Sequence, residues 1–493
     1  MLNNTNAGWP VKPLSEVVDL NPRLDKSAYR DDLEVSFVPM AAVEVGSGRM
    51  EVSQTKHFSV VKKGYTPFKE GDVLFAKITP CMENGKMAVV PKLTSGLGFG
   101  STEFHVLRPH EEIDPRFVYY FVSSQDFRRE AAHRMTGAVG QKRVPKSFLE
   151  EASIPVPLFE EQRRIVAEIE KQFSRLDEAV ANLKRVKANL KRYKAAVLKA
   201  AVEGKLTEGW RKQHPNIEPA NKLLDRILTE RRAKWNGRGK LKEPAKPDMS
   251  NLPSLPEKWT WASVDQLTSH ITSGSRDWTR YYGRGSGTFI LAQNVRLMRL
   301  DLSERQAVDP PKNDAETART RISIGDILVT IVGAKTGEVC RIPKELVDHF
   351  VCQSVALLRP LMPASAKFME LYLASPENGQ AQWRQYIYGQ GRPHLSFEQL
   401  KMTAIALPSL AEQQEIVAEV ERRLSVIEEL EAAVQANLTR AARLRQSILS
   451  QAFSGRLLGQ NTKHTPNVPP TFSMAAESQA SYGRTTLPGR EQR

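Results

Sequence analysis

The chain has 493 residues, of which 26% are charged and 40% hydrophobic, with a formal net charge of +15 and a pI near 9.6. This length exceeds one ordinary core and the composition is that of a folded protein, so we expect at least two globular domains. The positive charge favours a protein that binds a polyanion, nucleic acid before a membrane surface. The alternative is a basic soluble protein that binds no polyanion.

Several classes of protein are disfavoured at this stage. No apolar run approaches the roughly 20 residues needed to span a bilayer. Residues 1–7 have neither the charged start nor the apolar core of a signal peptide. The three cysteines, Cys81, Cys340 and Cys352, form no C-x-x-C pair, which argues against a disulfide framework or a zinc site. We therefore expect a cytoplasmic protein.

In chain order, residues 1–157 are expected to form a first mixed α/β domain. Short apolar runs broken by Gly, Pro and Asn indicate strands, and these lie at 35–43, 72–78, 86–90 and 104–107. Apolar and aromatic residues at helical spacing predict a helix over 116–134, followed by a loop of small and polar residues at 137–142.

A first long helix is predicted for residues 158–206. Apolar residues recur mostly in steps of three and four from Ile165 to Ala201, with no Pro or Gly before Gly204. About 43 helical residues measure about 65 Å at 1.5 Å per residue. One apolar stripe with charged flanks on so long a helix implies a coiled-coil partner.

The remainder of the chain contains a connector, a second domain, a second long helix and a tail. The connector (207–255) is expected to hold a short helix within 215–235 and an exposed linker rich in Gly, Pro and Lys. Residues 184–246 carry 19 Lys and Arg against 6 Asp and Glu, which fits either a solvated helix face or DNA contact. The second mixed domain (256–408) and second long helix (409–457) follow. The polar tail (458–493) is expected to be disordered.

The two long helices begin with nearly the same segment, 251 positions apart. Pro157–Glu168 matches Pro408–Glu419, and the register continues without a gap to Gly204-Lys205-Leu206 and Gly455-Arg456-Leu457. Such agreement indicates a tandem duplication.

The two domains share only short anchors. Gly71–Phe75 answers Gly325–Val329, and Leu107-Arg108-Pro109 answers Leu358-Arg359-Pro360. The residues between the anchors differ almost completely. Two domains that share a scaffold but differ in their loops are what the recognition of two different targets requires.

Motifs for catalysis are weak. Asp309-Pro310-Pro311 approaches the target-base loop of a methyltransferase, but Lys312 replaces the stacking aromatic. The glycine runs 96–100 and 283–287 are poor cofactor loops, and we expect the second to lie in a loop. The sequence contains no G-x-x-x-x-G-K-[ST] motif and no H-x-x-x-H pair. We expect no catalytic, cofactor or metal site in this chain.

Two variable domains, each followed by a long helix carrying Pro-x-x-x-Glu-Gln-x-x-Ile-Val, resemble the DNA-specificity subunit of type I restriction–modification systems. The resemblance implies an α+β fold in which two pseudo-symmetric target recognition domains are separated by two long helices in an antiparallel coiled coil. Each domain would read one half of an asymmetric, bipartite site in double-stranded DNA.

The resemblance also implies partners. The helices would set the spacer and dock two adenine-methyltransferase subunits, which bring S-adenosylmethionine. A restriction or translocase subunit, where one joins, would bring ATP. The helix-start residues expected to form the spacer and docking segment are Glu161, Gln162, Ile165, Val166, Glu412, Gln413, Ile416 and Val417. We expect their Glu and Gln side chains to cap or orient the helices, or to contact the methyltransferase, and not to act in catalysis.

Candidate DNA contacts follow from chemistry, because base edges give specificity and Lys or Arg on phosphates gives affinity. The candidates in the first domain are Lys77, Thr79, Asn84, Lys86, Gln141, Lys142 and Arg143. Those in the second are Ser275, Arg276, Gln293, Asn294, Lys335, Thr336, Gln390, Arg392 and His394. Arg143 and Arg392 recur in both copies and suit phosphate or the fold, whereas Lys142 and His394 differ and suit base reading. A surface or turn-forming role is the alternative for each.

Two rival functions remain open at this stage. A fused methyltransferase–recognition enzyme would bind S-adenosylmethionine without a partner. A structural adaptor that binds proteins through its long helices would give its complex no sequence-selective DNA footprint.

Overall fold

The structure is a computed structural model that describes residues 8–138, 140–233, 242–249, 252–274, 277–311, 314–387 and 393–459. The chain folds as two compact units, the first made of Met1–Glu178 with Ala441–Arg493 and the second of Ala179–Arg440. Each unit holds one globular domain and part of each long helix. The predicted α+β class is confirmed, and each unit is taken by itself below.

The first domain is built on two four-stranded sheets. One is antiparallel with the order β2-β9-β6-β7, and the other has the order β4-β3-β8-β5 with β3 and β8 parallel. The short strands β1 and β10 pair separately. The strands are β1 (Val11–Pro13), β2 (Val18–Leu20), β3 (Glu34–Val38), β4 (Gln54–His57), β5 (Thr66–Lys69), β6 (Val73–Ala76), β7 (Met87–Val89), β8 (Leu97–Gly100), β9 (Phe104–Pro109) and β10 (Ser153–Pro155).

Short helices cover this first domain. They are α1 (Phe58–Val61), α2 (Pro115–Ser123), α3 (Gln125–His133) and α4 (Lys146–Glu151), with 3-10 turns η1 (Leu14–Glu16), η2 (Lys26–Ala28), η3 (Met40–Ala42) and η4 (Thr94–Gly96). The single helix predicted over 116–134 is therefore two. Ser124 leaves the helical conformation at ψ 148°, and its hydroxyl accepts from the amide of Phe127 to cap α3.

The long helices close the core of the first unit. The start of α5 (Phe159–Val202) and the end of α13 (Leu410–Phe453) share one apolar cluster with α2 and the sheet. The Phe453 ring lies edge-on to Phe117 and Phe121, with ring centroids 5.2 and 5.3 Å apart. Arg445 on α13 pairs with Asp177 on α5 at 2.6 Å. Both helices therefore contribute buried apolar and aromatic area to the core of this unit.

The second domain repeats the topology of the first. Strands β11 and β21 pair as β1 and β10 do, and the antiparallel sheet β12-β20-β17-β18 repeats β2-β9-β6-β7. The other sheet has three strands, β16-β13-β19, and keeps one parallel pair. The strands are β11 (Thr260–Ser263), β12 (Thr268–Ser273), β13 (Tyr282–Ile290), β14 (Val295–Arg296), β15 (Arg299–Leu300), β16 (Gln306–Val308), β17 (Ile327–Thr330), β18 (Val339–Arg341), β19 (His349–Val351), β20 (Val355–Pro360) and β21 (Ala404–Leu407).

The short helices of the second unit are α6 (Glu208–Gln213), α7 (Ala220–Ala233), α8 (Val264–Leu267), α9 (Ala315–Thr320), α10 (Ala366–Ala374), α11 (Gly379–Ile387) and α12 (Phe397–Met402), with the 3-10 turns η5 (Asp277–Tyr281) and η6 (Pro363–Ser365). Of these helices, α6 and α7 lie in the connector. The glycine run 283–287, expected in a loop, lies within strand β13. The tail from residue 460 onward lies outside the described residues.

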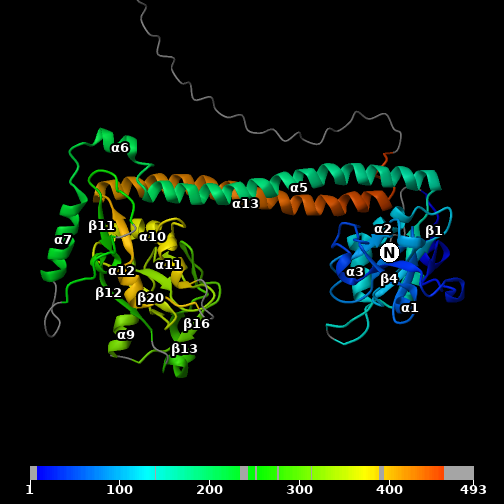
Figure 1. Cartoon of the computed structure of the whole chain (residues 1–493), viewed down its shortest axis with the longest axis horizontal. Helices are drawn as coiled ribbons and strands as arrows, with labels where there is room; N and C mark the ends of the chain where they lie inside the picture. The colour runs from blue at the N-terminus through cyan, green and yellow to red at the C-terminus, as the bar shows by residue number, and fades with distance from the viewer. Residues whose placement is uncertain are drawn as a thin grey trace, which may run out of the picture. The chain divides into compact units, whose positions relative to one another are not determined.

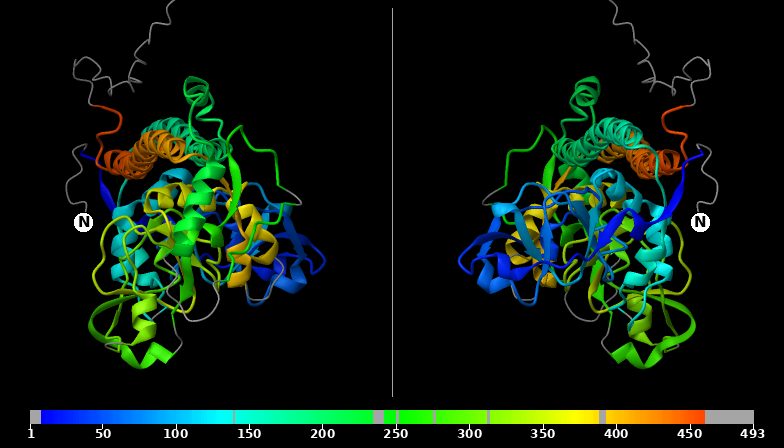
Figure 2. Two further views of the ribbon diagram at one scale, coloured as in Figure 1. Left: turned by 90° about the vertical axis from the view of Figure 1, so that its left-hand side faces the viewer. Right: turned by 90° about the vertical axis from the view of Figure 1, so that its right-hand side faces the viewer.

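Within the second unit, α5 and α13 run antiparallel and side by side, lengthwise in Figure 1 and end-on in Figure 2. Lys187 donates to Gln435 Oε1 at 2.9 Å. Thr207, which comes later in the chain and just past α5, donates to Oε1 of Glu412, which comes earlier in α13, at 2.7 Å. Their shared seam buries Leu190, Leu424 and Val434. The predicted antiparallel pairing of the two helices is confirmed.

In each domain, the Gly-Asp anchor and the Leu-Arg-Pro anchor supply the two partners of a buried ion pair. Asp72, at the start of β6, accepts two hydrogen bonds from Arg108 on β9, each 2.8 Å. Asp326 and Arg359 form the same bidentate pair at 2.8 and 2.6 Å. Each carboxylate is almost fully buried, with 1% and 2% of its side chain exposed, and raises the pKa of its arginine.

The turn before each aspartate needs glycine. Gly71 and Gly325 have φ values of +81° and +87°, a region that residues with a Cβ rarely adopt. The aspartate then also accepts a backbone N–H from the other side of the turn, Lys69 in one copy and Ser323 in the other. The Gly-Asp and Leu-Arg-Pro motifs therefore serve the sheet.

His105, on β9 of the first domain, is a buried polar residue. Its Nε2 lies 2.9 Å from the carbonyl of Val144, and its Nδ1 lies 3.0 Å from the side-chain amide nitrogen of Asn21. The neutral ring, donating from Nε2 and accepting at Nδ1, satisfies both contacts. Burial lowers the pKa of His105, and nearby Lys77 and Lys146 lower it further, although the Val144 bond and Glu103 oppose this.

The ion pair predicts a stability effect. Asp72→Asn should lower the free energy of unfolding of the first unit by about 3 kcal/mol, because Arg108 loses its counter-charge while it remains partly buried. Asp326→Asn should act alike on the second unit. Urea denaturation followed by unit-specific hydrogen exchange measures both. Asp32→Asn is the control, because the Arg30–Asp32 pair is 85% and 66% exposed and should contribute less than about 1 kcal/mol. Equal losses for Asp72→Asn and Asp32→Asn would contradict this account.

His105 predicts a pH effect with a defined sign. The unfolded chain takes up a proton near the ordinary histidine pKa of about 6.5, whereas folded His105 resists protonation to lower pH. Stability of the first unit should therefore fall below about pH 6.5, by up to about 1 kcal/mol between pH 6.5 and 5.5. His105→Gln, which keeps an amide donor, should remove this component, while His110→Gln at the surface should not. Urea midpoints across pH decide the matter, and an unchanged acid loss in His105→Gln would refute it.

Candidate nucleic-acid interface

In the first domain two loops that are distant in sequence form one surface. The amide of Thr79, in the loop after β6, donates to the carbonyl of Lys142 at 3.0 Å. The amide of Val144 donates to the carbonyl of Lys77 at 2.8 Å, and Ile78 bridges to Arg143. These bonds bring the first-domain candidates of both loops together.

The loop after β6 is wound on itself. Backbone hydrogen bonds close its turns. The amide of Met82 donates to the carbonyl of Ile78, that of Asn84 to Pro80 and that of Lys86 to Cys81, each at 3.0 Å. The Asn84 side chain is exposed, whereas Lys86 is half-buried and donates to the carbonyl of Met40 at 2.9 Å. These turns give the exposed side-chain amide of Asn84 a defined position.

The first-domain candidates differ in what they can offer a ligand. Asn84, Gln141 and Lys142 are exposed, and Lys77 and Thr79 are half-buried. Arg143 is committed to Glu103 by two hydrogen bonds of 2.9 and 2.8 Å, which hold the pKa of that carboxyl below its usual range. Of the two roles expected of an arginine that recurs in both copies, phosphate binding or support of the fold, this ion pair fits support of the fold.

The second domain builds the same surface. The amide of Gly333 donates to the carbonyl of Pro393 at 3.2 Å, and Val332 bridges to His394. The hydroxyl of Thr336 also donates toward Pro393, at 3.3 Å. Lys335 and His394 are exposed on this surface, with Lys335 Nζ 3.7 Å from Glu338.

Two second-domain candidates follow β13 and are not alike. Gln293 is exposed and donates to Glu304 at 3.3 Å. Asn294 is 2% exposed, accepts from the amide of Leu291, and donates to the carbonyls of Asp301 and Glu304 at 2.9 and 2.6 Å. Its side chain holds the turn after β13. Four further candidates, Ser275, Arg276, Gln390 and Arg392, lie outside the described residues.

Sequence reasoning missed the partners that organise these surfaces. Glu103, which binds Arg143, precedes β9 and is 40 residues away in the chain. Pro393, whose carbonyl accepts hydrogen bonds from Gly333 and Thr336, is even further from its donors, 57 residues from Thr336. No local pattern marks a pairing between such distant residues.

The Gln of each repeated Glu-Gln pair anchors its helix start. Gln162 is 1% exposed, accepts from the amide of Asp114 at 3.0 Å, and donates to the carbonyls of Glu112 and Pro157 at 3.2 and 3.0 Å. Gln413 donates to the carbonyl of Pro408 at 3.0 Å and is fully buried. The apolar helix-start residues Ile165, Val166 and Ile416 lie in the core of their units, and Val417 is half-buried.

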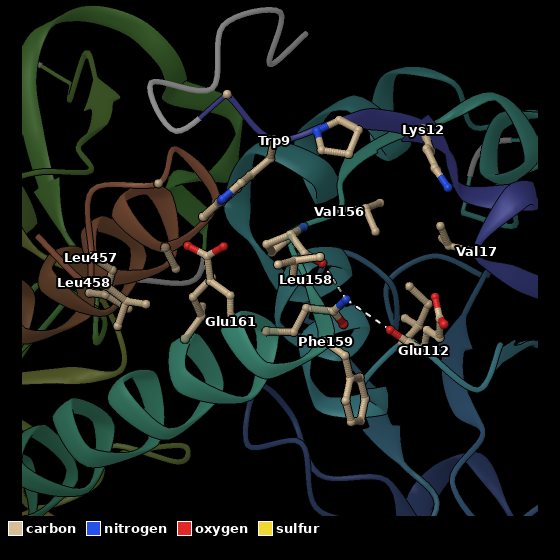
Figure 3. Close-up of a pocket in the computed structure, with 18 of the residues that line it drawn as sticks. Trp9, Lys12, Val17, Glu112, Val156, Leu158, Phe159, Glu161, Leu457 and Leu458 are labelled. Carbon is tan, nitrogen blue, oxygen red and sulfur yellow. Dashed lines mark hydrogen bonds between the residues drawn. The ribbon is translucent and has the colours of Figure 1, made fainter. Parts of the chain in front are cut away.

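The Glu of each pair has different surroundings in the two units. Glu412 is 2% exposed, accepts from the indole of Trp259 at 2.8 Å and from Thr207, and pairs with Arg211. Glu161 is half-buried and lines a cavity of about 970 Å³ with Trp9 and Leu158. Figure 3 shows Glu161 among these residues and the two leucines that follow α13, Leu457 and Leu458.

Within the described ranges, no group of three or more His, Cys, Asp or Glu side chains is placed to hold a metal ion. Among the described helices, none combines the length and apolar character needed to cross a bilayer.

Comparison with known proteins gives one consistent family. A model of the type I restriction modification DNA specificity domain matches residues 6–192 and 312–440. The chain is 27% identical over 486 residues to the type I restriction enzyme EcoEI specificity subunit of Escherichia coli, covering 87% of this chain and 80% of that protein. It is 26% identical over 476 residues to the EcoKI specificity subunit of Escherichia coli strain K12, covering 94% and 92%.

Two solved structures share the fold. One chain, from work on "complex assembly and conformational transition of the type I R-M system", has a TM-score of 0.67 at 22% identity and covers 91% of this chain and 98% of its own length. The HsdS subunit from Thermoanaerobacter tengcongensis has a TM-score of 0.53 at 21% identity, with 91% and 97% covered. Because the family model spans more than half of the chain and falls on both repeats, this chain belongs to the type I restriction modification DNA specificity family.

Proposed function

We propose that this chain is the DNA-recognition subunit of a type I restriction–modification complex and that each domain reads one half of an asymmetric, bipartite site. The observation that carries this proposal is the pair of equivalent two-loop surfaces. Both are fastened to the same scaffold by backbone hydrogen bonds, yet one exposes Asn84, Gln141 and Lys142 while the other exposes Lys335 and His394. Equal frames with unequal exposed chemistry suit two different half-sites.

The exposed side chains have the chemistry that base edges require. Asn and Gln can pair in a bidentate manner with adenine, and Lys can donate to guanine or to phosphate. The formal net charge of +15 supports binding to a polyanion, with an affinity that falls as salt rises. Asn294 and Arg143 belong to the framework that holds the surfaces, because their polar groups already serve the protein.

The long helices are proposed to set the spacer between the half-sites. Each has 44 residues, which is about 66 Å at 1.5 Å per residue, whereas readers on one face of DNA meet their half-sites about 34–36 Å apart. A pair of helices with a shared buried seam resists bending more than one helix does. Its length is therefore suited to fix a spacer.

The outer faces of the same helices are proposed to dock two adenine-methyltransferase subunits. In the second unit, Val186 and Tyr193 on α5 and Val426 and Leu430 on α13 are 44–50% exposed, which is unusual for large apolar side chains. Most of the Glu-Gln-x-x-Ile-Val residues are buried in their own units and support the spacer. S-adenosylmethionine is expected in the methyltransferase partners and ATP in a restriction subunit.

A helix-length variant tests the function directly. Four residues inserted after Leu183 in α5 and four after Leu438 in α13, both of which border the same apolar cluster, lengthen the pair by about 6 Å. The spacer should then grow by about two base pairs while both half-site sequences stay the same. Methylation of a randomised DNA library by the complex reconstituted with methyltransferase subunits, read by methylation-sensitive sequencing, gives the motif.

The matched control is a four-residue insertion after Lys246 in the connector, which should leave the spacer unchanged. A spacer that does not respond to the paired helix insertion would exclude the helices as its ruler. A wild-type complex that methylates without a bipartite motif would exclude the function itself.

Docking gives a separate prediction. Tyr193→Glu and Leu430→Glu each place a charge where an apolar contact with the methyltransferase would form, and affinity should fall at least 10-fold. Val347→Glu, on a 72% exposed apolar residue of the second domain, is the control and should bind normally. Calorimetry with the isolated methyltransferase subunit measures all three, and normal binding by both helix variants would refute docking on this face.

A further inference from the structure

Arg128, which the sequence did not single out, joins a helix to the loop after β6 in the first domain. Its Nη1 donates to the carbonyl of Glu83 at 2.6 Å, next to the exposed Asn84. Its Nε donates to the carbonyl of Ser123, the last residue of α2, at 3.1 Å. One guanidinium on α3 thus satisfies a helix-end carbonyl and a loop carbonyl together.

Gln380 makes the corresponding connection in the second domain. Its Nε2, on α11, donates to the carbonyl of Gly337 at 2.9 Å and to the carbonyl of Leu373, near the end of α10, at 2.8 Å. Gly337 directly follows Lys335 and Thr336 in the loop after β17. The second domain therefore joins the same three elements with a different side chain.

Glycines in both loops allow this approach. Gly85 and Gly337 have φ values of +73° and +94°. A Cβ built on Gly85 would lie 3.4 Å from Arg128 Nη1, and one on Gly337 would lie 3.2 Å from Gln380 Oε1. Each loop turns through a left-handed residue directly beside its donor, so the donor and the turn form one unit.

We propose that Arg128 and Gln380 are positioning residues that hold the DNA-reading loop of their own domain in its recognition geometry. This inference rests on the proposed function, since it assumes that these loops read DNA. These side chains are not base contacts in this proposal, because Arg128 Nη1 and Nε and Gln380 Nε2 donate to backbone carbonyls inside their own domain.

The consequence is a loss of discrimination that is confined to one half-site. Without its donor, the loop carbonyl turns to water and the loop samples more conformations, so the exposed Asn84 or Lys335 is no longer held at one base edge. Contacts to phosphate tolerate such movement better than contacts to bases, because a point charge attracts from many directions. Total DNA affinity should therefore change much less than sequence selectivity.

The experiment uses Arg128→Met and Gln380→Leu in the complex reconstituted with methyltransferase subunits. Matched controls on the same helices are Arg129→Met and Gln385→Leu, both at exposed positions. A DNA library randomised across the wild-type motif reports the ratio of cognate to single-mismatch methylation in each half-site. We expect Arg128→Met to lower this ratio about 10-fold in one half-site and Gln380→Leu to lower it in the other, with wild-type ratios in the controls.

A second readout does not involve DNA. Hydrogen exchange at the amides of Asn84 and Lys86, which are bonded within the loop, should accelerate several-fold in Arg128→Met and stay normal in Arg129→Met. Arg128→Lys, which retains a donor for the Glu83 carbonyl, should restore both the motif and the protection. If Arg128→Met does not fold, Arg128→Lys becomes the test variant. Because it keeps the donor, it should show the wild-type motif and the wild-type protection of the loop amides.

The outcomes separate the two proposals. A bipartite wild-type motif with unchanged half-site ratios in both variants, or unchanged loop exchange in Arg128→Met, overturns the positioning role alone. Equal loss in both half-sites from one variant also overturns it, because a general structural defect would then be the cause. A wild-type complex with no bipartite motif overturns the proposed function and this inference with it.

Discussion

The buried aspartate–arginine pair is the interaction on which each domain depends. A carboxylate at the start of one strand and a guanidinium on the neighbouring strand meet through two hydrogen bonds, beneath a glycine turn that only a residue without a Cβ adopts readily. The pair fixes the register of β6 on β9 and of β17 on β20. The loop that follows β6 or β17 starts from that fixed register, so the exposed residues inherit their position from a contact they do not touch.

This arrangement separates two demands that usually conflict. The ion pair and the apolar seams keep the scaffold the same in both copies, while the loops carry different residues at no cost to the sheet. Arg143 on Glu103 and Asn294 in its turn show that polar residues near the loops are not all available to a ligand. Residues that support the fold and residues that can contact a ligand are neighbours in the chain. They differ in whether their polar atoms already bind other groups of the protein.

The sequence predicted the regular parts well, for physical reasons. An apolar stripe that recurs at helical spacing over about nine turns or more cannot arise from a strand or a loop, so the spacing alone predicts α5 and α13, and the repeat indicates two related domains. Ser124 was overlooked because a hydroxyl that caps a new helix looks like any other polar residue inside a helical pattern. The glycine run 283–287 is typical of a loop, yet it lies in β13. There Gly285 approaches Asp309, just after β16, and Gly287 approaches the carbonyl of Val308, each too closely for a side chain. The loop partners Glu103, Pro393, Arg128 and Gln380 depend on tertiary contacts, which leave no local trace.

The pairing of β1 with β10, and of β11 with β21, has a consequence for how such a chain can change. Val11 lies opposite Pro155, and Thr260 lies opposite Leu407, so the chain enters and leaves each domain on adjacent antiparallel strands. Everything between the two strands is a closed excursion that returns to its starting point. A stretch of any other length or sequence that ends in the same strand pair would return the chain to the same helix start. Recombination between such chains could therefore exchange one reading module as a cassette while the helix starts and the partner module keep their geometry.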